Sequence, residues 1–354
     1  MINSDKKSLL LIPNFEKFIS HSKYGKRQCL SGKPVANGTL VQYNSVLKLL
    51  VAFEKDQNAT FRILILNKNN QKTNYAEKLY WKRFFRNLTL WLYKKKCLDN
   101  YISNIAKTLR AFFNYLLKER YLQIGTFHYQ FKVKTQAIPP IVLEPQQLRF
   151  LITNQSFKDK LTPKLQKLND IFVFGCTVGL RYNDLMHLKR TNIQNTDNGS
   201  YILLNTSKTG SQVKIPLPNY AIEIIDKYRR KSKKFVLPQL SNVNFNKGIK
   251  ELIEVAGWTY NYSKIRFKQG KAVEINNPKG NSYRFCDHIT AHTMRRTAIT
   301  TLLLLGVEEN IVRTISGHSP GSKEFYKYVA LVQNHLNKQV LNAFEKLIIS
   351  SQFE

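Results

Sequence analysis

Apolar residues at helical spacing constrain the fold of this chain more than any other feature. The clearest run recurs every three or four residues over 102–116, which predicts an amphipathic helix. A similar run over 80–92 predicts a second helix, and the capping-box pattern from Thr39 to Gln42 predicts the start of a third. We therefore expect a small helical domain over residues 39–130.

Glycine and proline mark the boundaries of this domain. Residues 1–38 are basic and contain Gly25, Gly32 and Pro34, so we expect an irregular N-terminal extension. The helical periodicity stops over 131–140, which ends in two consecutive prolines and is predicted to be a linker. The 354 residues are enough for two domains, and 141–354 is expected to be the second.

Both helical and strand patterns occur in the second domain. A helix is expected to end at Gly179, and two strand-like runs, 201–204 and 213–217, flank a turn over 206–211. The basic segment 257–285 suggests a second hairpin, after which helical spacing continues into an amphipathic last helix. The predicted fold class is mainly α with a small antiparallel β-sheet (α+β).

The large excess of basic residues indicates what kind of partner the protein binds. Lys and Arg number 56 against 23 Asp and Glu, and the resulting net charge of +33 favours a polyanion, with nucleic acid the best fit. No apolar run reaches membrane-spanning length and no signal peptide is recognised, so a cytoplasmic protein without a membrane partner is expected. Four well-separated cysteines indicate neither a zinc site nor a disulfide framework, and no cofactor is expected.

Candidate chemistry centres on His292 and Arg295, which share one helix face at a spacing of three. An imidazole and a guanidinium there could bind one phosphate, although the same pair also suits an ordinary solvated or core helix. Arg181 follows a Gly-Leu corner that could aim it into a cleft, with Asp184 either orienting it or forming a surface ion pair. Lys208 would stand at the tip of the predicted turn, where most lysines are merely solvated.

These segments, taken together, resemble the tyrosine recombinases, the phage-type integrases. The sequence around Arg181 is similar to the family's first arginine box, and that around Lys208 to its β-hairpin lysine. The His292-to-Arg295 segment resembles its His-x-x-Arg box, and Gly317-His318 its Gly-His motif. Tyr328 falls where the nucleophile is expected. The order of the motifs matches from about residue 140 onward and looks most like integrases of bacterial mobile elements.

The position of the nucleophile departs from the family pattern by one residue. The usual separation from His318 falls on Lys327, between Tyr326 and Tyr328. Tyr328 shares a helix face with apolar neighbours and would point inward, so it is the predicted nucleophile, with Tyr326 as the alternative.

The resemblance implies a mechanism without ATP or metal. A tyrosine would attack a DNA phosphodiester, giving a 3′-phosphotyrosine and a free 5′-hydroxyl. Arg181, Arg295 and His318 would hold the non-bridging oxygens. His292 would act as general acid–base, and Lys208 would protonate the leaving oxygen.

The resemblance also implies partners. A helical core-binding domain and a catalytic domain would bind double-stranded DNA as a homotetramer, for integration or excision of a mobile element. Accessory DNA-bending or directionality proteins are left open. The alternatives are a non-catalytic DNA-binding protein with the same fold and a type IB topoisomerase-like enzyme.

Overall fold

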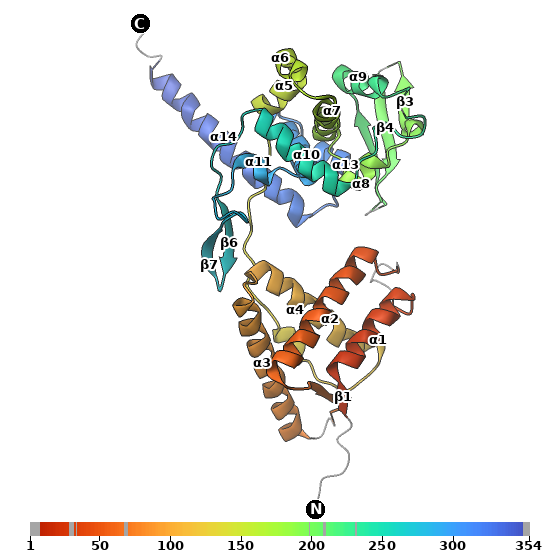
Figure 1. Cartoon of the computed structure of the whole chain (residues 1–354), viewed down its shortest axis with the longest axis vertical. Coiled ribbons are helices and arrows are strands. Elements are labelled where there is room, and N and C mark those ends of the chain that lie inside the picture. Colours follow the sequence, from red (N-terminus) through yellow and green to blue (C-terminus); the bar gives the residue numbers. More distant parts are fainter. Residues whose placement is uncertain are drawn as a thin grey trace, which may run out of the picture. The chain divides into compact units, whose positions relative to one another are not determined.

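The computed structural model describes residues 8–27, 32, 34–66, 70–197, 199–207, 210–230 and 232–349. The chain forms two compact units (Figure 1). The first comprises Met1–Ala137 together with Ile265–Glu274, and the second comprises Ile138–Lys264 and Ile275–Glu354. Among the described helices, none combines the length and apolar character needed to cross a membrane.

The first unit is built on four long helices. They are α1 (Leu11–Lys23), α2 (Asn37–Gln57), α3 (Gln71–Lys94) and α4 (Asp99–Asn114). A π-helical turn, Tyr115–Glu119, extends α4, and a short 3₁₀ helix, Phe127–Gln130, follows. Strands β1 (Ser8–Leu10) and β2 (Arg62–Leu64) pair antiparallel. Aromatic rings fill the core, with Trp81 stacked parallel to Phe127 at 5.2 Å between ring centroids.

Two expectations for this unit are wrong. The irregular extension over 1–38 instead contains α1, because Phe15 and Phe18 lie one turn apart on its apolar face and are fully buried. The Thr39–Gln42 capping box does not form, since α2 already begins at Asn37. Gln42 lies within α2, and its side-chain amide donates to the Thr108 hydroxyl at 3.0 Å.

A buried carboxylate in the first unit holds the tip of a hairpin. Asp99 is 1% exposed and accepts hydrogen bonds from the backbone N–H groups of Gln269 and Gly270, each at 2.8 Å, and from the Tyr93 hydroxyl at 2.7 Å. The tip belongs to the hairpin of β6 (Lys264–Lys268) and β7 (Lys271–Ile275). The second hairpin predicted over 257–285 is therefore confirmed as an element.

The second unit is a helical domain around a buried helix. Its helices are α5 (Pro145–Thr153), α6 (Gln155–Asp159), α7 (Pro163–Val178), α8 (Tyr182–Met186), α9 (Asn219–Lys227), α10 (Asn242–Val255), α11 (Phe285–His288), α12 (Ala291–Leu304), α13 (Glu309–Ser316) and α14 (Lys323–Ile349). Both α10 and α12 pack against α7. Pro145 occupies the first turn of α5, as predicted, beneath a capping box of Glu144 and Gln147.

A three-stranded antiparallel sheet borders these helices. It consists of β3 (Ile193–Thr196), β4 (Gly199–Asn205) and β5 (Gln212–Pro216), in that order. The β4–β5 hairpin is the one predicted, with Ile202 opposite Ile215, and both side chains are buried. β3 was not predicted as a separate strand, because only Ile193 of its four residues is apolar. The mainly α fold class with small antiparallel sheets is confirmed.

Candidate active site

Arg181 owes its position to the end of α7. Gly179 adopts the left-handed conformation (φ 64°) that ends the helix, and a β-carbon there would lie 3.2 Å from the Ala298 β-carbon on α12. The chain turns at once, and Arg181 becomes the N-cap residue of α8. Its Nη1 atom is buried and finds no hydrogen-bond partner among the described residues. A buried guanidinium N–H without a partner requires an acceptor from outside the chain.

Arg295 lies beside it on α12 and is almost fully buried, with 2% of its surface exposed. Its Nη1 donates to the Gly179 carbonyl at 3.1 Å, and its Nη2 lies 3.1 Å from His318 Nε2. Burial and then the neighbouring Arg181 lower the pKa of Arg295 to about 10. No ion pair of Arg295 occurs within the described ranges. Two adjacent guanidiniums without a counterion form an anion site.

His318 follows the sharp end of α13. Gly317 is left-handed (φ 61°), and a β-carbon there would approach Val213 of β5 to 3.3 Å, which fixes the corner close to the sheet. Burial, and then Arg295 and Arg181, lower the pKa of His318 to about 4. The ring is therefore neutral at pH 7 when no anion is bound. Its Nδ1 lies 2.8 Å from the Ser316 hydroxyl.

His292 occupies the first turn of α12, one turn before Arg295. The residue as a whole is exposed. The pKa of its ring is nevertheless lowered to about 4, first by loss of water around the ring and then by the positive charges of Arg296, Arg295 and Arg181. These charge interactions join His292 to the same cluster. A neutral imidazole at pH 7 can accept a proton.

The two candidate tyrosines differ sharply in environment. Tyr328 is 5% exposed, and its ring centroid lies 6.2 Å from that of His318, whereas Tyr326 is 49% exposed. Tyr328 belongs to a small apolar cluster that joins α12, α13 and α14: Ile299, Leu303, Val312, Phe325, Tyr328 and Val332. The Tyr328 phenol is also close enough to act on the pKa of Arg295. Tyr328 therefore lies at the anion site.

Lys208 lies outside the described residues. The residue before it, Ser207, donates its backbone N–H to Asp184 Oδ1 at 3.0 Å. The expectation that Asp184 orients Arg181 is not supported, since Asp184 instead holds the turn that leads to Lys208, and no hydrogen bond or ion pair joins it to Arg181 among the described residues. The contact between Asp184 and Ser207 was not predicted from the sequence, because these two residues lie 23 positions apart.

The donor set favours anions over metals. Within the described ranges, no group of three or more histidine, cysteine or carboxylate side chains could hold a metal ion. The two arginines supply positive charge, and together with the two imidazoles they supply N–H donors, which suit phosphate oxygens. With a phenol beside them, they can stabilise the charge that develops when a nucleophile attacks phosphorus.

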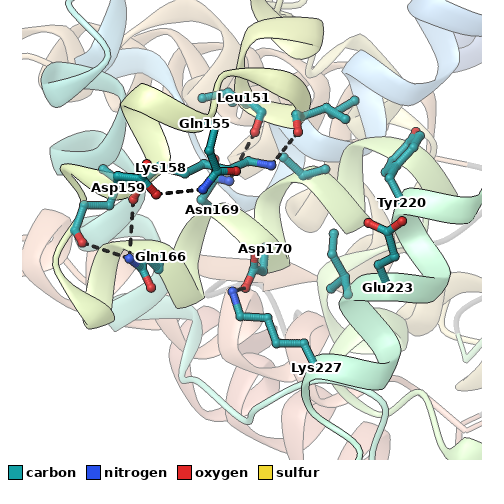
Figure 2. Close-up of a pocket in the computed structure, with 14 residues that line it drawn as sticks. Leu151, Gln155, Lys158, Asp159, Gln166, Asn169, Asp170, Tyr220, Glu223 and Lys227 are labelled. Atoms are coloured by element: carbon teal, nitrogen blue, oxygen red, sulfur yellow. Dashed lines mark hydrogen bonds and ion pairs between the residues drawn. The ribbon is translucent and has the colours of Figure 1, made fainter.

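A pronounced depression elsewhere in the second unit contains none of these residues. It has a volume of about 420 Å³ and lies among α5, α6, α7 and α9 (Figure 2). Its polar side chains largely bind one another, as in the pair of Lys227 and Asp170 at 2.6 Å and the Gln155–Asp159 hydrogen bond at 2.7 Å. This depression is therefore separate from the anion site.

A phenol beside two arginines and two histidines suits an enzyme that transfers a phosphoryl group through a tyrosine. Residues 143–335 match the model of the phage integrase family. The match covers more than half of the chain and the whole region that holds the candidate site, and the chain belongs to the phage integrase family. It is a site-specific recombinase of the tyrosine type, and the predicted family and function are confirmed. No curated protein matches the sequence.

Solved structures show the same fold. A lambda integrase dimer bound to a COC′ core site has a TM-score of 0.57 at 14% identity, over 91% of this chain and 78% of that one. The Tn1549 transposon integrase in complex with circular intermediate DNA has a TM-score of 0.56 at 16% identity, over 90% and 94% of the two chains. A lambda integrase tetramer bound to a Holliday junction gives 0.55 at 15%, over 91% and 78%.

Proposed function

We propose that Tyr328 is the nucleophile of this recombinase. Its hydroxyl oxygen attacks the phosphorus of a DNA phosphodiester, the bond from phosphorus to the 5′ oxygen breaks, and a 3′-phosphotyrosine and a 5′-hydroxyl result. Attack by a 5′-hydroxyl on the phosphotyrosine reverses the step and rejoins a strand. One observation supports the proposal: the nearly buried phenol lies beside two guanidiniums for which the described part of the chain supplies no ion pair.

The remaining roles follow from charge and protonation. Arg181 and Arg295 bind the non-bridging oxygens, and the bound phosphate favours protonation of His318, which then donates a third hydrogen bond. Neutral His292 takes the proton from the tyrosine as the new bond forms. Lys208 gives a proton to the departing 5′ oxygen. The covalent link conserves the energy of the phosphodiester, so the proposal needs neither ATP nor metal.

The role of Lys208 comes from the resemblance, and only the residue before it is described. The Asp184 carboxylate accepts from the backbone N–H of Ser207, and Asp184 stands three residues after Arg181 in the chain. Ser207 is therefore anchored to the segment that carries Arg181.

Replacement of each tyrosine tests the proposal. On a nicked suicide substrate, from which the 5′ fragment is lost, the wild-type protein should accumulate a covalent protein–DNA adduct. Tyr328→Phe should give no adduct yet bind the DNA within about twofold of wild type, because only the attacking oxygen is lost. Tyr326→Phe is the matched control and should form the adduct at the wild-type rate. The measurement is adduct formation on denaturing gels.

The opposite result would contradict the assignment. If Tyr326→Phe abolishes the adduct and Tyr328→Phe does not, the nucleophile is Tyr326. If no variant and no wild-type protein forms an adduct on any site that it binds, the protein is a non-catalytic member of the family. Relaxation of supercoils by a monomer, without exchange between two sites, would favour a topoisomerase-like role.

The proposal extends to the whole assembly. We assign DNA binding to both the helical domain over 39–130 and the catalytic domain over 141–354, joined by 131–140. Recombination requires four strand cuts, so a homotetramer on double-stranded DNA is proposed, as in the lambda integrase tetramer on a Holliday junction. We propose that this tetramer integrates or excises a mobile element in the cytoplasm. Accessory DNA-bending or directionality proteins are left open.

A further inference from the structure

Ser316 contacts the active-site imidazole but belongs to none of the motifs. It is the last residue of α13 and is 3% exposed. Its hydroxyl oxygen lies 2.7 Å from the Val312 carbonyl oxygen, 3.2 Å from that of Arg313 and 2.8 Å from His318 Nδ1. Arg295 Nη2 lies at similar distances from both ring nitrogens, 3.3 Å from Nδ1 and 3.1 Å from Nε2, whereas the Ser316 hydroxyl contacts Nδ1.

Counting protons fixes the direction of these bonds. A guanidinium can only donate, so Arg295 bonds to whichever ring nitrogen carries no proton, and its two similar distances do not choose between them. A neutral imidazole carries one proton, so the contact with Ser316 decides where that proton lies. The single hydroxyl proton of Ser316 goes to the nearer carbonyl, that of Val312, which leaves the oxygen free to accept from Nδ1. The network therefore selects the tautomer of His318 with the proton on Nδ1.

We propose that Ser316 is a positioning residue that holds His318 through Nδ1, so that Nε2 is always the nitrogen turned toward the scissile phosphate. The inference rests on the proposed function, in which His318 binds that phosphate. When the phosphate enters, Arg295 Nη2 turns to it, and Nε2 gains a proton and donates to the same anion. The bond from Nδ1 to Ser316 persists in both states, so the ring does not have to rotate during the reaction.

Ser316 also acts on the charge of the ring. Arg295, Arg181 and His292 disfavour the imidazolium, whereas Glu324 of α14 favours it, and together with burial they leave the pKa of His318 low. A hydrogen bond from Nδ1 is stronger when the ring is charged. Removal of the hydroxyl should therefore lower the pKa of His318 further and make its protonation at the phosphate harder.

The tautomer can be measured without DNA. Ring ¹⁵N chemical shifts of the full-length protein at pH 7 should show the His318 proton on Nδ1. Ser316→Ala should give a mixture with the Nε2-protonated tautomer, and Ser316→Thr should restore the wild-type pattern. Thr314→Ala is the matched control. Thr314 is on the same helix and its hydroxyl binds the carbonyl four residues back, at 2.9 Å from Asn310, without a hydrogen bond to an imidazole.

Single-turnover cleavage of the nicked substrate tests the consequence. Ser316→Ala should cleave about tenfold more slowly, by analogy with the loss of partners that orient metal-bound imidazoles. The limb on which the rate falls with rising pH should move to lower pH. Ser316→Thr should recover the rate, and Thr314→Ala should match wild type. The shift of the pH limb is the result that a merely structural role of the serine would not predict.

Two outcomes would overturn the inference. One is a wild-type ring protonated on Nε2. The other is a Ser316→Ala variant with unchanged tautomer and unchanged pH profile. Failure of the proposed function gives a different result, since an inactive wild-type protein would still show the tautomer and its dependence on Ser316.

Discussion

Two basic side chains buried in this protein, Arg295 and His128, differ in whether they keep their positive charge. Arg295 keeps its charge, and no carboxylate forms an ion pair with it among the described residues, so its buried charge favours an incoming anion. His128 in the first unit gives up its charge instead. Its ring is fully buried against Phe113 and its Nε2 lies 3.0 Å from Asn114 Oδ1. The first arrangement serves binding, and the second makes folding sensitive to pH.

Acid should destabilise the first unit through His128. Burial, and then Arg110 and Lys118, lower the pKa of His128 to about 4 from an ordinary value of 6.5. The unfolded chain therefore binds the proton below pH 6.5, whereas the folded chain binds it only near pH 4. The free energy of unfolding should fall between these values, by about 3 kcal/mol in total from this group. Urea titrations followed by tryptophan fluorescence at several pH values measure the loss.

The control for this prediction is His128→Gln, which keeps an amide N–H for Asn114 and does not titrate. Two of the three tryptophans, Trp81 and Trp91, lie in the first unit, so the fluorescence reports mainly on that unit. The variant should lose most of the dependence on pH between 4 and 6.5. An unchanged slope would assign the acid sensitivity to other groups.

At the scale of elements, the contact between α7 and α12 positions the arginines. Gly175 lies in the interior of α7, and a β-carbon there would collide with Met294 Sδ and come within 3.2 Å of Leu185. Met294 is fully buried and directly precedes Arg295. The close approach of the two helices therefore depends on the absence of a side chain at Gly175.

Gly175→Ala should destabilise the protein and slow DNA cleavage. Helix propensity alone would stabilise the variant by up to ~1 kcal/mol, but overpacking of a buried contact costs ~1–3 kcal/mol and should prevail. Met294→Ala should relieve the collision, so the double variant should lose less stability than the sum of the single variants. Thermal unfolding and single-turnover cleavage measure both effects.

Gly38→Ala provides the matched comparison for Gly175. Gly38 lies in α2, and a β-carbon there meets nothing within 4 Å. This variant should show no loss of stability. A Gly175→Ala protein as stable and as active as Gly38→Ala would show that α7 and α12 tolerate a wider separation.

Local signals account for what could be predicted from the sequence. Gly179 predicted the end of α7 and the corner before Arg181. Helical spacing predicted that His292 and Arg295 share one face of α12. Ser316 and His318 are only two residues apart, so their contact is a local one. It was not predicted, because a serine at the end of a helix does not by itself indicate a role in a site. The bond of Asp184 to Ser207 joins distant segments and could not be read from local pattern. Helix α1 was missed because nearby glycines and lysines obscured its apolar face.

For the whole molecule, an excess of 33 positive charges favours a polyanionic substrate. Self-repulsion destabilises the folded chain, and DNA phosphates relieve it. On α3, for example, Lys82, Arg83 and Arg86 are exposed while Trp81 and Phe84 face the core, so one face of the helix presents only cations over this stretch. Such a face suits the phosphate backbone and carries no sequence information by itself.

DNA affinity should therefore depend steeply on salt. With roughly 6–10 phosphate contacts, affinity for a labelled duplex should fall about 10³–10⁵-fold between 50 and 200 mM salt, because binding releases condensed counterions. Replacing Arg83 by glutamine should lower the slope of log affinity against log salt by ~0.9 if that residue contacts one phosphate. Lys164→Gln is the comparison, since Lys164 already pairs with Glu251 at 2.8 Å. Fluorescence anisotropy measures all three slopes. A shallow wild-type slope, equivalent to one or two contacts, would mean that the positive charge is not used for binding DNA and would contradict its proposed role.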